Sequence, residues 1–167
     1  MCIRDSRKVH FMAKSQLFTR PLQFVYTHGG VFPVRRGHRD AEAFKTAHAI
    51  LGRGGMIVMY AEAGRSRSGE LGKPRHGIGR LALESGAPVV PCAIAGSEKA
   101  RNWRKLQFPK VTVQFDKPLR FESVEEPAKD QAQAASEIVF DRVKIMHNRL
   151  TGEGRASAQR AARAARA

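Results

Sequence analysis

The sequence predicts an α/β fold in which a mixed, largely parallel sheet is flanked by helices. From Phe11 onward, short apolar runs with the two-residue period of strands alternate with longer runs that have the period of a helix. The chain has 167 residues, which suits one domain, and its 42% apolar content is enough for a packed core. These observations exclude a chain that is disordered throughout.

Five short apolar runs are predicted as strands, and they cover residues 9–13, 30–34, 56–61, 89–95 and 111–115. A helix is predicted between the second and third strands, with Asp40 as its N-cap and the glycines that begin at Gly52 as its end. The apolar face of this helix consists of Ala43, Phe44, Ala47, Ile50 and Leu51. Together these elements form one β-α-β unit.

Two further helices are predicted. The first covers residues 77–85 and ends at Gly86 in the left-handed conformation. Its inward residues are Ile78, Leu81 and Ala82. The second covers residues 130–150, because apolar residues recur there three or four positions apart. Residues 151–167 are rich in Ala, Arg, Gly and Ser, and we expect a frayed helix or a disordered basic tail.

The chain is strongly basic, with 30 Lys and Arg against 15 Asp and Glu, a net charge of +15. The excess is concentrated in residues 1–80, which hold 15 basic and 5 acidic residues. Such a bias indicates a polyanionic partner: nucleic acid, an anionic membrane surface or a phosphorylated substrate. Composition does not choose among these three, so the motifs must decide.

Cysteine usage and hydropathy predict a reducing compartment and no membrane span. Cys2 and Cys92 are far apart and match neither a disulfide framework nor a metal-binding pattern, so we expect no metal and no disulfide. The longest apolar stretch, residues 86–96, contains two prolines and is too short to span a bilayer. Residues 1–8 are charged and lack the apolar core of a signal peptide.

A polar loop, residues 62–69, follows the strand predicted at 56–61. Its glycines Gly64 and Gly69 have the spacing of a Walker A loop, but Glu70 and Leu71 stand where Lys and Ser or Thr would be needed. The loop instead offers arginines, hydroxyls and backbone amides, which suit a phosphate monoester because Arg can bind it with two hydrogen bonds. A solvated turn is the alternative interpretation of the same residues.

A second basic cluster, residues 33–37, follows the strand predicted at 30–34. If the two strands are parallel neighbours, both clusters leave the sheet at its carboxyl edge, where ligands bind in open α/β sheets. They could then converge on one anion. The alternatives are two surface arginines and, for Glu62, an ion pair with Arg65 or Arg36 that merely holds the loop.

Three ordered motifs resemble the glycerolipid acyltransferases, the family typified by 1-acyl-glycerol-3-phosphate acyltransferases. The family's Gly-x-x-Pro-Val-x-Arg-Gly motif is present at residues 30–37, and its Phe-Pro-Glu-Gly-Thr-Arg-Ser motif has a relative at residues 60–66. Residues 87–96 resemble the next motif. The resemblance covers more than half of the chain and implies a glycerol-3-phosphate acyltransferase-like fold, with residues 7–127 as a partial catalytic domain and 128–150 as a C-terminal helix.

The resemblance also implies roles for residues. Arg36, Arg65, Ser66 and Glu62 would form the pocket for the acceptor's phosphate, and Pro91 would position the strand beneath it. The structurally important motif positions are Gly30, Pro33, Gly37, Gly64, Gly69, Gly77 and Pro91. The family transfers a fatty acyl group to a lysophospholipid from acyl-CoA or acyl carrier protein, with no other cofactor. It implies a peripheral protein on the cytoplasmic face of the cell membrane.

One family motif is missing. The family's general base is a His-x-x-x-x-Asp dyad, and none of the six histidines has Asp five positions later. No histidine has a nearby acidic residue to orient it, so we expect no substitute base and little turnover from the 167 residues. The expected explanation is an N-terminal truncation, with residues 1–6 as a non-native start. The phosphate-binding motif also departs from the family at Ala61, Ala63 and Gly64.

Two other classes of function fit the charge. A basic nucleic-acid-binding module is one, but aromatic residues make up only 7% of the chain and no zinc-finger, recognition-helix or RNP pattern is present. We therefore expect no specific nucleic acid. The other is a non-catalytic peripheral membrane module, held to anionic lipid by the arginines of the 151–167 tail. This second class is compatible with an acyltransferase.

Overall fold

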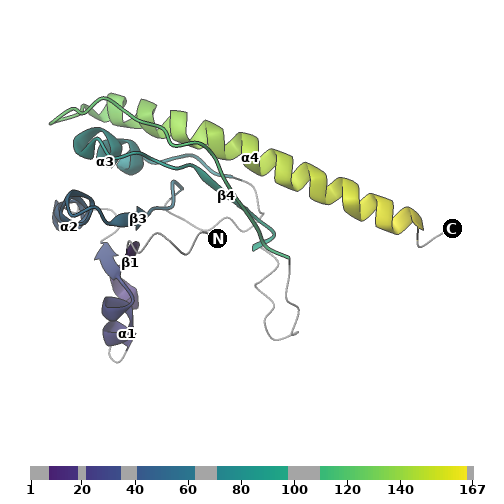
Figure 1. Cartoon of the computed structure of the whole chain (residues 1–167), viewed down its shortest axis with the longest axis horizontal. Coiled ribbons are helices and arrows are strands. Elements are labelled where there is room, and N and C mark those ends of the chain that lie inside the picture. Colours follow the sequence, from purple (N-terminus) through teal and green to yellow (C-terminus); the bar gives the residue numbers. More distant parts are fainter. Residues whose placement is uncertain (1–7, 19–21, 35–40, 63–70, 98–109, 165–167) are drawn as a thin grey trace.

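Three parallel strands form the central sheet of the computed structural model, which describes residues 8–18, 22–34, 41–62, 71–97 and 110–164. Strand β1 (Val9–Lys14) lies in the middle, between β2 (Val31–Val34) and β3 (Met56–Val58). Both neighbours run parallel to β1, and β1 and β3 lie side by side in Figure 1. The three carboxyl ends therefore point to one edge of the sheet, which we call the carboxyl edge.

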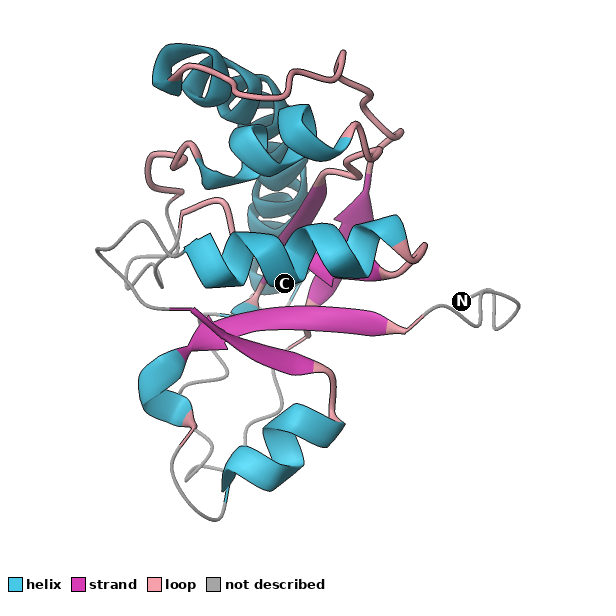
Figure 2. Ribbon diagram, turned by 90° about the vertical axis from the view of Figure 1, so that its left-hand side faces the viewer, coloured by secondary structure: helices cyan, strands magenta, loops and turns pink. Residues whose placement is uncertain are grey.

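Helices connect the three strands. The 3₁₀ helix η1 (Ser15–Leu17) and helix α1 (Leu22–His28) lie between β1 and β2, and helix α2 (Ala41–Gly52) lies between β2 and β3. Figure 2 shows helices on both sides of the three strands. The sequence did not predict α1, because its apolar residues do not fall on one face of a helix. In the structure, two of them, Phe24 and Val25, are exposed to solvent.

A buried apolar core lies between α2 and the sheet. Phe32, Ala47 and Leu81 are buried at its centre. The predicted apolar face of α2 is confirmed, since Ala43 is also buried. The partly buried residues that pack against this core are Met12, Val34, Phe44, Ile50, Leu51, Ile57 and Met59.

Helix α3 (Gly77–Ser85) has the predicted bounds. It ends at Gly86, which has φ = 60° and donates its backbone N–H to the carbonyl of Ala82 over 3.0 Å. The left-handed conformation favours glycine because it has no Cβ. The predicted stop signal of this helix is therefore confirmed.

Strands β4 (Cys92–Ala95) and β5 (Thr112–Phe115) form a separate antiparallel pair. The strand predicted at 89–95 is divided into an isolated bridge, Val89 to Leu119, and β4 itself. Pro91 lies between them, and proline cannot donate a ladder hydrogen bond. The predicted combination of parallel and antiparallel pairing is present, with the parallel strands in the amino-terminal part of the sequence.

Helix α4 (Lys129–Ala164) packs on α3 and β4 and projects well beyond the rest of the chain (Figure 1). Its 36 residues correspond to a length of about 54 Å. In the part of α4 up to Gly152, whose side chains the structure describes, the buried residues are Ala132, Ala135, Ser136, Val139, Phe140 and Met146.

Of the two forms expected for the 151–167 tail, a frayed helix or a disordered segment, the helix is the one present, because the backbone of α4 is helical through Ala164. Ala and Arg are strong helix formers, and they outweigh the cost of Gly152 and Gly154 in this stretch. The Asp40 N-cap, the start at residues 1–6 and the last three residues of the tail lie outside the described residues.

Candidate functional site

Two arginine-bearing segments leave the sheet at its carboxyl edge. Val34 ends β2 and pairs with Lys14 at the end of β1, and segment 35–40 follows it directly. On the other side of β1, strand β3 ends at Val58, residues 59–62 follow it, and segment 63–70 begins after Glu62. The strands are parallel as predicted, although each is a neighbour of β1 and not of the other.

Most of the predicted phosphate-binding residues lie in these two segments. Arg36 and Gly37 belong to segment 35–40, while Gly64, Arg65, Ser66 and Gly69 belong to segment 63–70, and all six lie outside the described residues. What the structure describes is where the two segments leave the sheet. Their shared edge is the geometry that convergence on one anion requires.

The ends of segment 63–70 are joined by two hydrogen bonds. The Oε2 atom of Glu62 accepts the backbone N–H of Gly72 over 2.8 Å. The carbonyl of Ala61 accepts the backbone N–H of Arg75 over 3.0 Å. We call these four residues the loop base. They bring together chain positions on either side of the segment that carries Arg65.

The downstream side of the loop base is also tied to α4. The side-chain amide of Gln133 donates to the carbonyl of Pro74 over 3.3 Å. One turn further along α4, Ser136 Oγ accepts the backbone N–H of Gly79 over 2.8 Å. The start of α3 is thus held against α4 by polar contacts as well as by packing.

Two motif residues at β2 have clear structural reasons. Gly30 is buried and has φ = 77°, and a Cβ there would lie 3.0 Å from the carbonyl oxygen of Val9. Pro33 is exposed and lies on an edge strand, where the missing N–H does no harm. Glycine is therefore required at residue 30 by the close approach of β1, and proline is tolerated at residue 33.

The remaining described motif residues are Gly77 and Pro91. A Cβ on Gly77 would lie 3.9 Å from the ring of Phe44, which is ordinary contact, so packing does not demand glycine there. Pro91 is fully buried, and its carbonyl accepts the N–H of Asp116 over 3.0 Å. This bond extends the β4–β5 ladder by one position.

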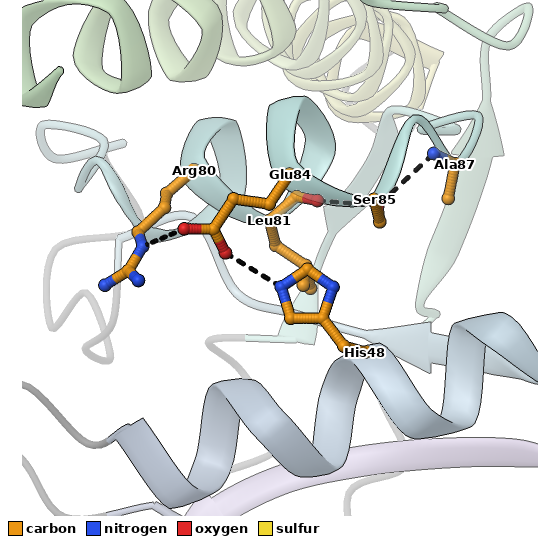
Figure 3. A network of polar contacts seen from close by, with 6 residues as sticks. All are labelled: His48, Arg80, Leu81, Glu84, Ser85 and Ala87. Carbon is orange, nitrogen blue, oxygen red and sulfur yellow. Dashed lines mark hydrogen bonds and ion pairs between the residues drawn. The ribbon is translucent and has the colours of Figure 1, made fainter. Parts of the chain in front are cut away.

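The expectation that no histidine has an acidic partner was wrong for His48. Its Nε2 lies 2.8 Å from Oε2 of Glu84, which is 36 positions away in the sequence and close only because α2 packs against α3 (Figure 3). The Nε of Arg80 donates to the other oxygen of Glu84 over 2.6 Å. His48 lies in the second half of α2, which ends shortly before β3 begins, so this pair lies toward the edge opposite the carboxyl edge.

These contacts control the ionisation of Glu84. Burial raises the pKa of this carboxyl, but the hydrogen bonds and charges of Arg80 and His48 outweigh burial and hold the pKa below its ordinary value. The ionised carboxylate therefore joins α2 to α3. We assign the His48–Glu84 pair to the packing of these helices.

A cavity of about 410 Å³ lies at the amino end of β1. Lys8, His10, Thr46 and Arg53 contribute its polar lining. The Nδ1 atom of His10 is buried and has no hydrogen-bond partner among the described residues. The cavity is at the opposite end of β1 from the carboxyl edge, so it does not belong to the candidate site.

The described ranges contain neither a metal site nor a membrane span. In them, no group of three or more His, Cys, Asp or Glu residues is placed to hold a metal ion. None of the described helices is both long enough and apolar enough to cross a bilayer.

Burial raises the pKa of the Cys92 thiol, which keeps it protonated and weakly nucleophilic.

Sequence reasoning missed three residues that support the site: Gly72, Gly79 and Ser136. A signal for Gly79 was present, because glycine inside a helix costs about 1 kcal/mol and usually has a packing reason. Gly72 and Ser136 gave no such signal. Their partners are 10 and 57 positions away, and only the fold brings them together.

Similarity to known proteins places the chain in a family. The family model described as Acyltransferase matches residues 1–95, more than half of the chain. The chain therefore belongs to the acyltransferase family. The basic nucleic-acid-binding alternative receives no support from this result.

Two individual proteins are similar. The chloroplastic 1-acyl-sn-glycerol-3-phosphate acyltransferase BAT2 of Brassica napus is 27% identical over 92 residues, which is 53% of this chain and 27% of that protein. The crystal structure of the 1-acyl-sn-glycerophosphate (LPA) acyltransferase PlsC from Thermotoga maritima has a TM-score of 0.63 at 22% identity, covering 86% of this chain and 57% of that one. The chain thus spans about a quarter of the curated relative and little more than half of the solved structure, whose likeness shows the shared fold.

Proposed function

We propose that the chain takes part in the transfer of a fatty acyl group to 1-acyl-glycerol-3-phosphate, which gives phosphatidic acid in phospholipid synthesis. Membership of the acyltransferase family supports the reaction class, and the named activity of the Brassica relative supports the acceptor. The observation that carries the proposal is the common edge from which the segments of Arg36 and Arg65 leave the sheet.

The chemistry of these residues suits the acceptor's phosphate. A guanidinium group can donate two parallel hydrogen bonds to phosphate oxygens and carries a permanent positive charge. Arg36 and Arg65 would bind the phosphate from two sides, and the Ser66 hydroxyl would add a donor. Binding of the phosphate orients the acceptor so that its free hydroxyl can attack the thioester carbon of the acyl donor; the ester bond forms as the carbon–sulfur bond breaks and the donor's thiol leaves.

Acyl transfer also requires a general base that takes the proton of the acceptor hydroxyl. We assign no base within this sequence, because it contains no His-x-x-x-x-Asp and the acidic partner of His48 serves helix packing. The proposed role of this chain is therefore recognition of the acceptor. The acyl donor is proposed to be acyl-CoA or acyl carrier protein.

We also propose that the chain works at the cytoplasmic face of a membrane as a peripheral protein. Its net charge of +15 favours an anionic lipid surface. Its proposed substrate is itself a membrane lipid. A basic protein surface would meet such an acceptor at the membrane.

An acyl-transfer assay tests the proposed function. The chain is joined behind the His-x-x-x-x-Asp segment of an active family member, and transfer of radiolabelled acyl groups to lysophosphatidic acid is measured. We expect transfer that falls at least about a hundredfold when Arg36 and Arg65 are both changed to Ala, the loss of two charge-assisted contacts. Unchanged transfer in that double variant would remove the phosphate role.

A further inference from the structure

We infer that Glu62 is a positioning residue that closes the loop base through its hydrogen bond to Gly72, and that it does not contact the phosphate of the acceptor. The family resemblance implied only that Glu62 belongs to the phosphate pocket. The sequence left an ion pair with an arginine as the alternative. The geometry of Glu62 comes from the described contacts, and the role given to it in binding the acceptor rests on the proposed function.

The chemistry of a carboxylate argues against direct phosphate binding. An ionised Glu accepts hydrogen bonds and cannot donate them, and a phosphate monoester is also an anion that needs donors. In the structure, Oε2 of Glu62 already accepts the Gly72 N–H over 2.8 Å. The side chain therefore has a partner of the kind that a carboxylate requires.

Gly72 is suited to this contact. A Cβ at this position would lie 3.1 Å from Oε2 of Glu62, closer than most real Cβ contacts. A larger side chain would push against the carboxylate that the amide must reach. Glycine at this position therefore leaves room for the approach.

The hydrogen bond between Glu62 and Gly72 affects Arg65 and Ser66, because both lie between its two ends in the sequence. Glu62 and Gly72 are ten residues apart and enclose segment 63–70. Joining the ends of a loop removes many of the conformations that it would otherwise sample. The second bond, between Ala61 and Arg75, and the contact of Gln133 with Pro74 hold the downstream end on α4. Glu62 thus reduces the ordering that phosphate binding would otherwise require.

Two substitutions separate this role from a role of the charge. Glu62→Gln keeps a carbonyl oxygen that can accept the Gly72 N–H but removes the negative charge, whereas Glu62→Ala removes both. Exchange of the Gly72 amide proton is measured by NMR in the 167-residue chain, together with trypsin cleavage after Arg65 and Arg67. Glu122→Ala, which removes a charge from an exposed position, is the matched control.

We expect Glu62→Ala to speed Gly72 exchange and cleavage at least about tenfold, since the Gly72 N–H loses its acceptor. Both rates should stay within about fivefold of the parent chain's in Glu62→Gln, and both should equal the parent chain's in Glu122→Ala. Equal effects of Gln and Ala would show that the charge matters and would overturn the inference. No effect of either variant on Gly72 would overturn it as well.

Titration with sn-glycerol 3-phosphate separates this inference from the proposed function. Glu62→Ala should bind this probe more weakly than the parent chain, whereas Glu62→Gln should keep most of the parent's affinity. The melting temperature should change little in either variant. If the parent chain fails to bind this probe while Gly72 exchange still responds to Glu62→Ala alone, the proposed function fails and the closure of the loop base stands. If binding is lost equally in both variants, Glu62 acts through its charge and the inference fails.

Discussion

Ser136 on helix α4 accepts the backbone N–H of Gly79 on helix α3 over 2.8 Å. The two helices approach so closely here that a Cβ on Gly79 would lie 2.7 Å from the backbone nitrogen of Ser136 and would overlap the carbonyl of Ala132. This contact fixes the start of α3, the helix that follows the loop base. The stability of the folded chain should therefore depend on both residues.

Gly79→Ala should destabilise the protein strongly. The added methyl group must displace backbone atoms of α4, and overpacking of this kind costs about 1–3 kcal/mol or more. Gly77→Ala is the control, because its Cβ would have ordinary contacts at 3.9 and 4.0 Å and alanine favours the helix. Urea denaturation should show a lower free energy of unfolding for Gly79→Ala alone. Equal values for the two variants would contradict the close approach.

Ser136→Ala should also destabilise the chain. His76 precedes α3 and makes no side-chain capping bond, so the N–H of Gly79 depends on the Ser136 hydroxyl. A buried donor left without its acceptor costs about 1–3 kcal/mol. Ser123→Ala, at an exposed position, should have little effect in the same thermal unfolding experiment. A Ser136→Ala variant as stable as Ser123→Ala would exclude this capping role.

The stability of the fold should fall in acid partly through Glu84. Because its pKa is lower in the folded chain than in the unfolded chain, its contribution is present above the ordinary pKa and is lost as pH falls through the folded value. Glu84→Gln should therefore lower the free energy of unfolding near neutral pH and flatten its decline below about pH 4.5. Parallel curves for the two proteins between about pH 6 and about pH 3 would contradict the assignment.

His48→Gln should leave recognition of the acceptor intact. The His48–Glu84 pair joins two helices away from the carboxyl edge, so its loss should affect stability by about 1 kcal/mol or less at this partly exposed position. Binding of sn-glycerol 3-phosphate should not change. Loss of binding or transfer in a stably folded His48→Gln protein would show that this histidine serves the reaction.

The basic end of the chain should strengthen binding to anionic vesicles. Residues 151–167 carry four arginines and one glutamate, and each basic residue near such a surface contributes about 1 kcal/mol. Removal of this segment should weaken co-sedimentation with vesicles that contain phosphatidylglycerol, and high salt should reduce the difference. Equal sedimentation of the 1–150 protein and the full chain would remove the segment from membrane binding.

Local signals in the sequence were sufficient for much of the fold. The end of α3 follows from Gly86, and the buried face of α2 follows from the spacing of Ala43 and Ala47. Helix α1 had no such signal because Phe24 and Val25 are exposed. The tail has few apolar residues, so the sequence left a frayed helix and a disordered segment open, and its Ala and Arg content favours the helix.

The candidate site was predicted only in part, for a physical reason. Motif spacing identified Glu62, but its hydrogen bond to Gly72 depends on how the chain returns after segment 63–70. The partner of His48 was missed in the same way, since Glu84 is distant in sequence and adjacent only through helix packing. Contacts between distant segments follow from the tertiary fold, and no local pattern records them.

Recognition of the acceptor's phosphate is measured most simply as the affinity of the chain for sn-glycerol 3-phosphate. Calorimetry measures this affinity, with glycerol as the ligand that lacks the phosphate. We predict that the phosphorylated compound binds and glycerol does not, and that Arg36→Ala with Arg65→Ala weakens binding at least about tenfold. Arg142→Ala with Arg149→Ala, which removes the same charge from exposed positions on α4, should leave the affinity nearly unchanged. Equal affinities of these two double variants would contradict phosphate recognition by Arg36 and Arg65.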